Sequence, residues 1–126
     1  MTEKLDCNII QADCEKLLKT NFSEKIDLTF LDPPFNQDKD YQSHDDKMPE
    51  TEYWDWIRRV CDLIYQKTVD GGAIYFMQRE KNTRFVLETL SKSGWTFQNL
   101  IMWHLHTSHD SALPLSFSLE LSHYQK

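Results

Sequence analysis

Four consecutive residues carry most of the chemistry in this sequence: Asp32, Pro33, Pro34 and Phe35. A carboxylate can accept hydrogens from an amino group whose lone pair is delocalised into an aromatic ring, and can thereby pull that nitrogen toward tetrahedral geometry. Prolines have no N–H, so they present carbonyl oxygens, and Phe35 offers a flat face for stacking. These residue types suit the activation of the exocyclic amino group of a nucleobase taken out of its helix.

The position of this motif strengthens that interpretation. It directly follows the apolar run Ile26–Leu31, which predicts a buried strand. In open α/β sheets, ligands bind beyond the carboxyl ends of strands. The alternative is that Asp-Pro-Pro only ends the strand and opens a turn, which its residue types also favour.

The elements that must hold this motif alternate between strand and helix. Asp13 is a predicted N-cap for a helix over 14–19, and Gly71-Gly72 and Gly94 are predicted to end two longer helices. Strands are predicted at 7–10, 26–31, 73–78 and 95–104, helices at 52–69 and 80–93, and a half-exposed strand at 113–121, where leucine and phenylalanine alternate with polar residues. The pattern predicts an α/β fold with a mostly parallel sheet.

Composition narrows the class of protein further. The 126 residues carry a formal net charge of -6, of which the segment 37–52 contributes six acidic against two basic residues. We expect a solvated connection there, and no bulk-charge affinity for nucleic acid. No apolar run resembles a signal peptide or a membrane span, so we expect a cytoplasmic protein. Three cysteines do not suggest a disulfide framework, and the histidines at 104, 106 and 109 are not interpreted as a metal site.

At these motifs the chain resembles the site-specific DNA amino-methyltransferases, in the group whose catalytic motif precedes the glycine-rich cofactor motif. The resemblance rests on 9–14 (IIQADC), 26–28 (IDL), the Asp-Pro-Pro-Phe motif with Asn36, and then Tyr53, Trp56, Gly71-Gly72 and Trp103. It implies a Rossmann-like fold, S-adenosylmethionine as methyl donor, and DNA as the partner. It also implies an association with restriction–modification, and a target that is adenine N6 more often than cytosine N4.

The resemblance assigns roles residue by residue. Asp32, Pro33, Pro34 and Phe35 would hold the target base, while Asp13 and Cys14, with Asp32, would lie at the cofactor. Trp54 and Trp56 flank the start of a helix, where we expect core packing, with one of them shielding the pocket mouth as the alternative.

Glycine is scarce, because the only glycines are at 71, 72 and 94 and no Gly-x-Gly occurs. We therefore expect an incomplete fold, truncated before the glycine-rich motif, with a catalytic part over 1–104 and a divergent tail over 105–126. Two other functions stay open: methylation of RNA or of a protein amide, and a non-catalytic remnant. The oligomeric state also stays open.

Overall fold

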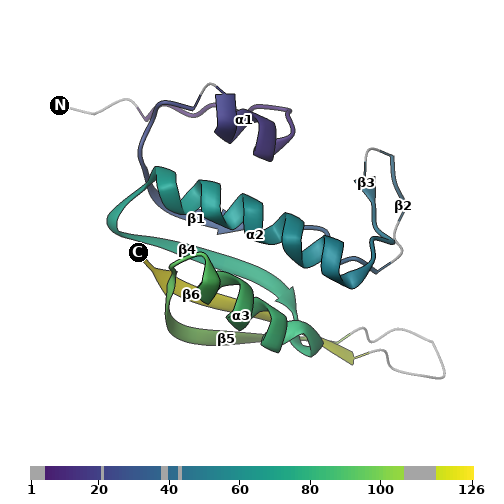
Figure 1. Cartoon of the computed structure of the whole chain (residues 1–126). Helices are drawn as coiled ribbons and strands as arrows, with labels where there is room; N and C mark the ends of the chain where they lie inside the picture. Colours follow the sequence, from purple (N-terminus) through teal and green to yellow (C-terminus); the bar gives the residue numbers. More distant parts are fainter. Residues whose placement is uncertain (1–4, 21, 38–39, 43, 107–115) are drawn as a thin grey trace.

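Four strands form the main sheet, in the order β1-β4-β6-β5 (Figure 1). The computed structural model describes residues 5–20, 22–37, 40–42, 44–106 and 116–126. In chain order the elements are α1 (Cys14–Thr20), β1 (Ile26–Leu31), β2 (Asp40–Tyr41), β3 (His44–Asp45), α2 (Glu50–Lys67), β4 (Thr68–Arg79), the 3₁₀ helix η1 (Glu80–Asn82), α3 (Thr83–Lys92), β5 (Thr96–His106) and β6 (Ser116–Gln125).

The pairing in this sheet is mixed. β1 and β4 are parallel, and Leu31 lies opposite Phe76. β6 is antiparallel to both β4 and β5. The α/β fold is confirmed, but fewer of the described strands are parallel than the sequence pattern suggested. Antiparallel pairing needs no helical crossover, and β6 follows β5 without one among the described residues.

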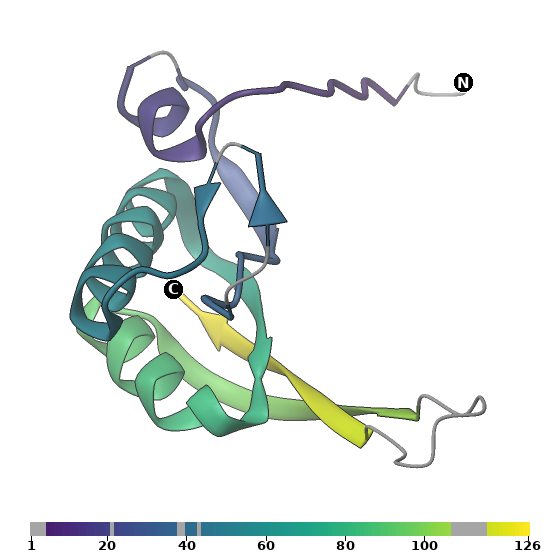
Figure 2. The ribbon, with the colours of Figure 1, turned by 90° about the vertical axis from the view of Figure 1, so that its right-hand side faces the viewer.

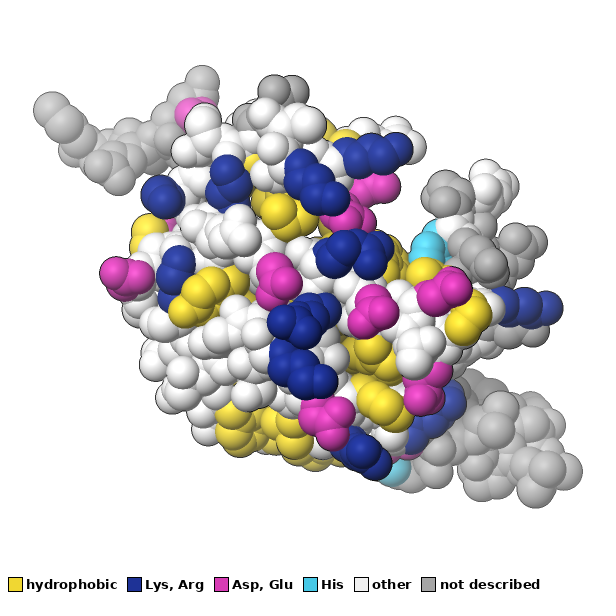
Figure 3. Space-filling model, in the orientation of Figure 1, with side chains coloured by type: hydrophobic (Ala, Val, Ile, Leu, Met, Phe, Trp, Pro, Cys, Tyr) yellow, Lys and Arg dark blue, Asp and Glu magenta, His cyan; other side chains and the backbone are white. Residues whose placement is uncertain are grey.

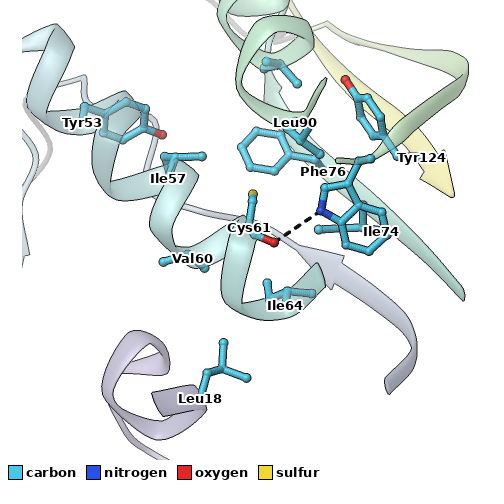
Figure 4. Packing of buried hydrophobic residues seen from close by; sticks show 12 residues of the cluster. Leu18, Tyr53, Ile57, Val60, Cys61, Ile64, Ile74, Phe76, Leu90 and Tyr124 are labelled. Atoms are coloured by element: carbon cyan, nitrogen blue, oxygen red, sulfur yellow. Dashed lines mark hydrogen bonds between the residues drawn. The ribbon is translucent and has the colours of Figure 1, made fainter. Parts of the chain in front are cut away.

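The helices α2 and α3 cover one face of the sheet, as Figure 2 shows. Apolar residues of α2 recur at helical spacing, and Tyr53, Ile57, Cys61 and Ile64 are all buried. Figure 4 shows these side chains facing β4, with Leu18 of α1 reaching toward α2 from the other side. The core is the layer between the helices and the sheet, and it contains Leu18, Tyr53, Ile57, Val60, Cys61, Ile64, Ile74, Phe76, Val86, Leu90, Trp95 and Tyr124.

The local signals for α1 and for the end of α3 are confirmed. Asp13 Oδ1 accepts the backbone N–H groups of Glu15 at 2.9 Å and Lys16 at 3.2 Å, which makes it the N-cap of α1. Gly94 follows α3 with a φ of +99°, and its N–H donates to the carbonyl of Ser91. A positive φ favours glycine at the end of a helix.

The prediction that Gly71-Gly72 ends a helix is wrong. Helix α2 ends at Lys67, and both glycines lie inside β4. Gly71 has a φ of +81°, and a Cβ on Gly72 would lie 2.4 Å from Cγ2 of Thr68 and 3.0 Å from the carbonyl oxygen of Asp27. Two glycines are therefore needed where the backbone of β4 turns and passes close to β1.

Two of the predicted strands, 26–31 and 7–10, also differ from what the structure shows. The strand Ile26–Leu31 forms as predicted, but Leu28 is 60% exposed and Phe30 is 56% exposed. Ile26 and Leu31 pack against the core and are partly buried, so the predicted burial of this strand is wrong. Residues 7–10, predicted as a strand, are exposed and have no strand assignment. A strand needs a neighbouring backbone to bond with, and none of the described strands pairs with this segment.

The C-terminal residues are an integral part of the sheet. The alternating pattern predicted a half-exposed strand at 113–121, and β6 occupies Ser116–Gln125, between β4 and β5. Glu120, Ser122 and Tyr124 of this strand are buried on its helix side. Within the segment 105–126, Ser116–Gln125 thus forms an inner strand of the sheet, although the sequence of this segment departs from the family pattern. No helix in the described part of the chain has the length and apolar character needed to cross a membrane.

Candidate active site

The Asp-Pro-Pro-Phe motif leaves the carboxyl end of β1, as the sequence predicted. Asp32 is exposed, Pro33 is buried, and Pro34 and Phe35 are half-buried. Because β1 and β4 are parallel, the carboxyl end of β4 reaches the same edge of the sheet, which brings Gln78 close to the motif. The four motif residues therefore form one turn, with the carboxylate facing solvent and the prolines against the protein.

A chain of buried hydrogen bonds ties this turn to the core. The hydroxyl of Tyr53, on α2, donates to the carbonyl oxygen of Pro34, and the same hydroxyl accepts a hydrogen from Nε2 of Gln78 at 2.9 Å. Oε1 of Gln78 in turn accepts the backbone N–H of Arg79 at 2.9 Å. Tyr53 and Gln78 are almost completely buried. The carbonyl of Pro34 is thus tied to both α2 and β4, two elements that belong to the core.

A second set of hydrogen bonds holds the two residues that follow the turn, Asn36 and Gln37. Asn36 has a φ of +57°, a left-handed conformation that asparagine tolerates better than most residues. The carboxylate of Asp46 accepts the backbone N–H groups of Asn36 and Gln37, each at 2.8 Å. The side chain of Asn36 also pairs with the backbone of Met48, donating at 2.7 Å and accepting at 2.8 Å. The turn is therefore held on both sides.

Asp46 was missed by sequence reasoning, which treated segment 37–52 as a solvated connection. In the structure β2 and β3 pair in this segment, and Asp46 after them is only 2% exposed. An acidic residue among other acidic residues gives no signal that it caps a turn ten positions earlier. Tyr53 was noted only as part of the family resemblance, and Gln78 only within a predicted strand.

A small hollow of about 110 Å³ opens beside the turn. The ring of Phe35 and the ring of Trp54 both line it, and Trp54 stacks on Phe85 of α3 with ring centroids 5.5 Å apart. Polar side chains complete its wall, so it combines aromatic faces with hydrogen-bonding groups. It is lined by Phe35, Asn36, Glu50, Tyr53, Trp54, Lys81 and Asn82.

The residues assigned to the cofactor lie at a different hollow, of about 350 Å³. It is lined by Gln11, Ala12, Asp13, Cys14 and Trp56. Asp32 lines neither hollow. The structure therefore brings Asp13 and Cys14 together with each other and with Trp56, but it does not bring them into one pocket with the Asp-Pro-Pro-Phe turn. The two tryptophans of α2, Trp54 and Trp56, pack against the core as expected, and each also lines one of the hollows.

In the second hollow, the surroundings of Cys14 favour its uncharged thiol over the thiolate. Desolvation and the neighbouring Asp13 raise the pKa of Cys14, so this thiol stays protonated near pH 7. Oδ1 of Asp13 is engaged as the cap of α1. Cys7, Cys14 and Cys61 are all free thiols, and within the described ranges no group of histidine, cysteine and carboxylate side chains could hold a metal ion.

Comparison with known proteins places this site in a family. The family model described as DNA methylase (N6_N4_Mtase) matches residues 26–116, which include β1, the Asp-Pro-Pro-Phe turn and β4. The type II methyltransferase M.MjaVI of Methanocaldococcus jannaschii is 46% identical over 93 residues, covering 65% of this chain and 46% of that protein. The DNA adenine methyltransferase YhdJ of Escherichia coli is 28% identical over 100 residues, covering 79% of this chain and 34% of that protein.

The fold agrees with this match. The solved structure of an M1.HpyAVI–SAM complex superposes with a TM-score of 0.64 at 16% identity, covering 94% of this chain and 53% of that chain. The chain thus has the Rossmann-like architecture of methyltransferases, and it spans less than half the length of the curated relatives that it matches. Since the family model covers most of the chain, the protein belongs to the DNA methylase family, the DNA amino-methyltransferases.

Proposed function

We propose that this protein contributes to the transfer of a methyl group from S-adenosylmethionine to the exocyclic amino group of a DNA base, with adenine N6 as the target. The observation that carries the proposal is the Asp-Pro-Pro-Phe turn at the carboxyl end of β1, held rigidly by Tyr53 from one side and by Asp46 from the other. A turn that only ended a strand would not need two buried polar anchors. Rigid positioning is what this chemistry requires of a protein.

Each residue of the turn has a distinct role. Asp32 is exposed, so its carboxylate is available to accept a hydrogen of the amino group. We assign the second acceptor to the carbonyl of Pro33, because the Pro34 carbonyl faces the buried hydroxyl of Tyr53, which donates to it. Two acceptors on one nitrogen would localise its lone pair for direct attack on the methyl carbon. As the new N–C bond forms, the bond from that carbon to sulfur would break, S-adenosylhomocysteine would leave, and the nitrogen would lose one proton to water. Phe35, together with Trp54 in the same hollow, offers aromatic faces for the flipped base.

The hollow at Asp13 and Cys14 fits one part of the methyl donor. It has an aromatic wall at Trp56, and its volume of about 350 Å³ lies at the lower end of the range for small-molecule sites. We therefore assign the adenosine of S-adenosylmethionine to Gln11, Asp13, Cys14 and Trp56. The donor supplies an electrophilic methyl group on a sulfonium. Because burial and Asp13 raise the pKa of Cys14, its thiol is a poor nucleophile near pH 7, which agrees with direct transfer without a covalent enzyme intermediate.

Two findings on relatives support the choice of donor and target. YhdJ, whose match extends over 79% of this chain, is a DNA adenine methyltransferase. The solved structure of M1.HpyAVI, which shares the fold, is a complex with SAM.

Asp32 would act by accepting a hydrogen bond from the amino group and focusing negative charge at the nitrogen, more than by removing a proton before the attack.

A chimaera tests the proposal. Residues 26–104 of this chain replace the aligned stretch of M.MjaVI, and transfer of labelled methyl from S-adenosylmethionine to unmethylated duplex DNA is measured, with RNA and protein as parallel substrates. We expect labelling of DNA, and N6-methyladenine in the digested product. Asp32→Ala should lower the rate at least a hundredfold, while Asp55→Ala, an exposed carboxylate on α2, should leave it unchanged. Equal rates for both variants would refute the role of Asp32, and labelling confined to RNA or protein would refute the substrate.

A further inference from the structure

The indole of Trp56, on α2, contacts more than the hollow that it lines. That hollow also contains Asp13 and Cys14. The ring of Tyr53, whose hydroxyl donates to the carbonyl of Pro34, meets the indole edge to face, with ring centroids 5.9 Å apart. Tyr53 and Trp56 are three residues apart on α2, so they lie on the same side of the helix. One aromatic side chain therefore connects the cofactor hollow with an anchor of the Asp-Pro-Pro-Phe turn.

The imidazole of His44 contacts the same indole from a different element. His44 belongs to β3, which pairs with β2 in a hairpin, and its ring stacks on Trp56 with centroids 4.9 Å apart and an interplanar angle of 27°. Two residues further along the chain, the buried carboxylate of Asp46 accepts the backbone N–H groups of Asn36 and Gln37. The segment that follows this turn thus contacts the wall of the cofactor hollow at one residue and holds the end of the turn at another.

Helix α1 gives this hollow another connection to the rest of the protein. Leu18 of α1 packs into the core, and Glu15 accepts a hydrogen bond from Nε of Arg59 on α2 at 3.0 Å. Figure 3 shows charged side chains of both signs over α1, α2 and α3. The side chain of Arg59 is 53% exposed, and exposed ion pairs contribute little to stability. This route joins α1 to α2, whereas the contacts of Trp56 lead on to the turn.

We propose that His44 is a positioning residue that couples the cofactor hollow to the Asp-Pro-Pro-Phe turn. A ligand seated against Trp56 restricts the indole to the orientation in which His44 stacks on it, and the hairpin then keeps Asp46 bonded to the end of the turn. Because such coupling is reciprocal, an ordered turn also favours binding at the hollow. The inference rests on the proposed function for the identity of the ligand, S-adenosylmethionine. The turn that receives the target base is therefore best ordered when the methyl donor is bound.

The backbone N–H groups of Asn36 and Gln37 report how firmly Asp46 holds the turn. Their hydrogen exchange is measured by NMR on the full chain, first without ligand. His44→Ala should speed this exchange by about two- to tenfold, the range that corresponds to the loss of one aromatic pair. Amides of β4 in the same spectra should be unaffected, which separates a local change at the turn from a general loss of stability.

Two further variants serve as a rescue and a matched control. His44→Phe keeps a flat ring on Trp56, so it should restore the exchange rates of the unaltered chain. His123→Ala also removes a half-buried imidazole that stacks on an aromatic ring, in this case Tyr75 with centroids 4.5 Å apart. Tyr75 lies between the buried Ile74 and Phe76 on β4, so this pair is on the sheet face away from α2. The control should leave exchange at the turn unchanged.

Adding S-adenosylmethionine tests the coupling itself. At saturation it should slow exchange at Asn36 and Gln37 by about two- to tenfold in the unaltered chain and in His44→Phe, and by less than about twofold in His44→Ala. If S-adenosylmethionine shifts no resonance of the chain, the assignment of adenosine to this hollow is wrong, and the comparison without ligand still decides the role of His44.

Three results would overturn the proposal. The first is exchange at the turn that is as slow in His44→Ala as in the unaltered chain, or that His123→Ala speeds equally. The second is an equal rise in exchange at the β4 amides, since His44 would then support the fold in general. The third is full slowing by S-adenosylmethionine in His44→Ala, which would show that the ligand orders the turn without this imidazole.

Discussion

The hydroxyl of Tyr53 is the most informative single group to remove from this protein. Tyr53→Phe keeps the ring in the core and deletes only the oxygen that joins Pro34 to Gln78. A buried donor or acceptor left without a partner costs about 1–3 kcal/mol. The Pro34 carbonyl is half-buried and can recover part of this by bonding to water, whereas Gln78 is fully buried. We therefore expect the free energy of unfolding to fall by about 2–4 kcal/mol.

This loss is large enough to measure by standard methods. Unfolding entropy averages about 2.1 cal/mol/K per residue, so for a chain of this length 1 kcal/mol corresponds to a shift of about 4 °C in Tm. Thermal unfolding followed by circular dichroism should thus show a fall of about 8–15 °C, and urea unfolding should show the same change in free energy. The control is Tyr65→Phe on the same helix, at a half-buried position where water can replace a lost partner.

A double-mutant cycle tests the reasoning itself. Replacing both members of a buried hydrogen bond with apolar groups costs far less than the sum of the single losses. The pair Tyr53→Phe and Gln78→Leu should therefore be less destabilising than the two single changes added together. Strict additivity, or a Tyr53→Phe loss no greater than that of Tyr65→Phe, would show that this hydroxyl does not connect the turn to the core.

Three further predictions concern other parts of the structure. Asp46→Asn should lower the free energy of unfolding by about 1–3 kcal/mol, because the buried carboxylate accepts two backbone N–H groups. Urea unfolding measures this change, and an equal loss of unfolding free energy in Asp55→Asn, at an exposed position, would contradict the prediction. Burial raises the pKa of Glu120, so the folded state holds its proton more tightly than the unfolded state and stability falls as the pH rises from about 4.5 through the folded pKa. Glu120→Gln should remove that fall in urea unfolding at pH 4, 6 and 8, and parallel pH profiles would refute the assignment. Gly72→Ala should destabilise more than Gly71→Ala in thermal unfolding, because its new methyl group meets atoms at 2.4–3.0 Å, whereas at position 71 only the positive φ is strained; the reverse order would refute this account.

The sequence alone determined those features that depend on neighbouring residues. The cap at Asp13, the helical spacing of Ile57, Cys61 and Ile64, and the glycine after α3 are local signals, and each corresponds to the observed element. The position of the Asp-Pro-Pro-Phe motif at the end of a strand was also predictable. An apolar run indicates a strand, and the two prolines after Asp32 lack the N–H groups needed to continue its hydrogen bonding.

Only the tertiary structure decided how these elements meet. Tyr53 and Pro34 are 19 residues apart, and Gln78 and Tyr53 are 25 residues apart, so no spacing rule links them. The predicted helix end at Gly71-Gly72 is inside β4, because the close passage of β1 sets the need for glycine there. An apolar run indicates a strand, but it does not indicate which of its side chains other elements cover. In the structure the helices lie on one face of the sheet only, and Leu28 and Phe30 of β1 are more than half exposed.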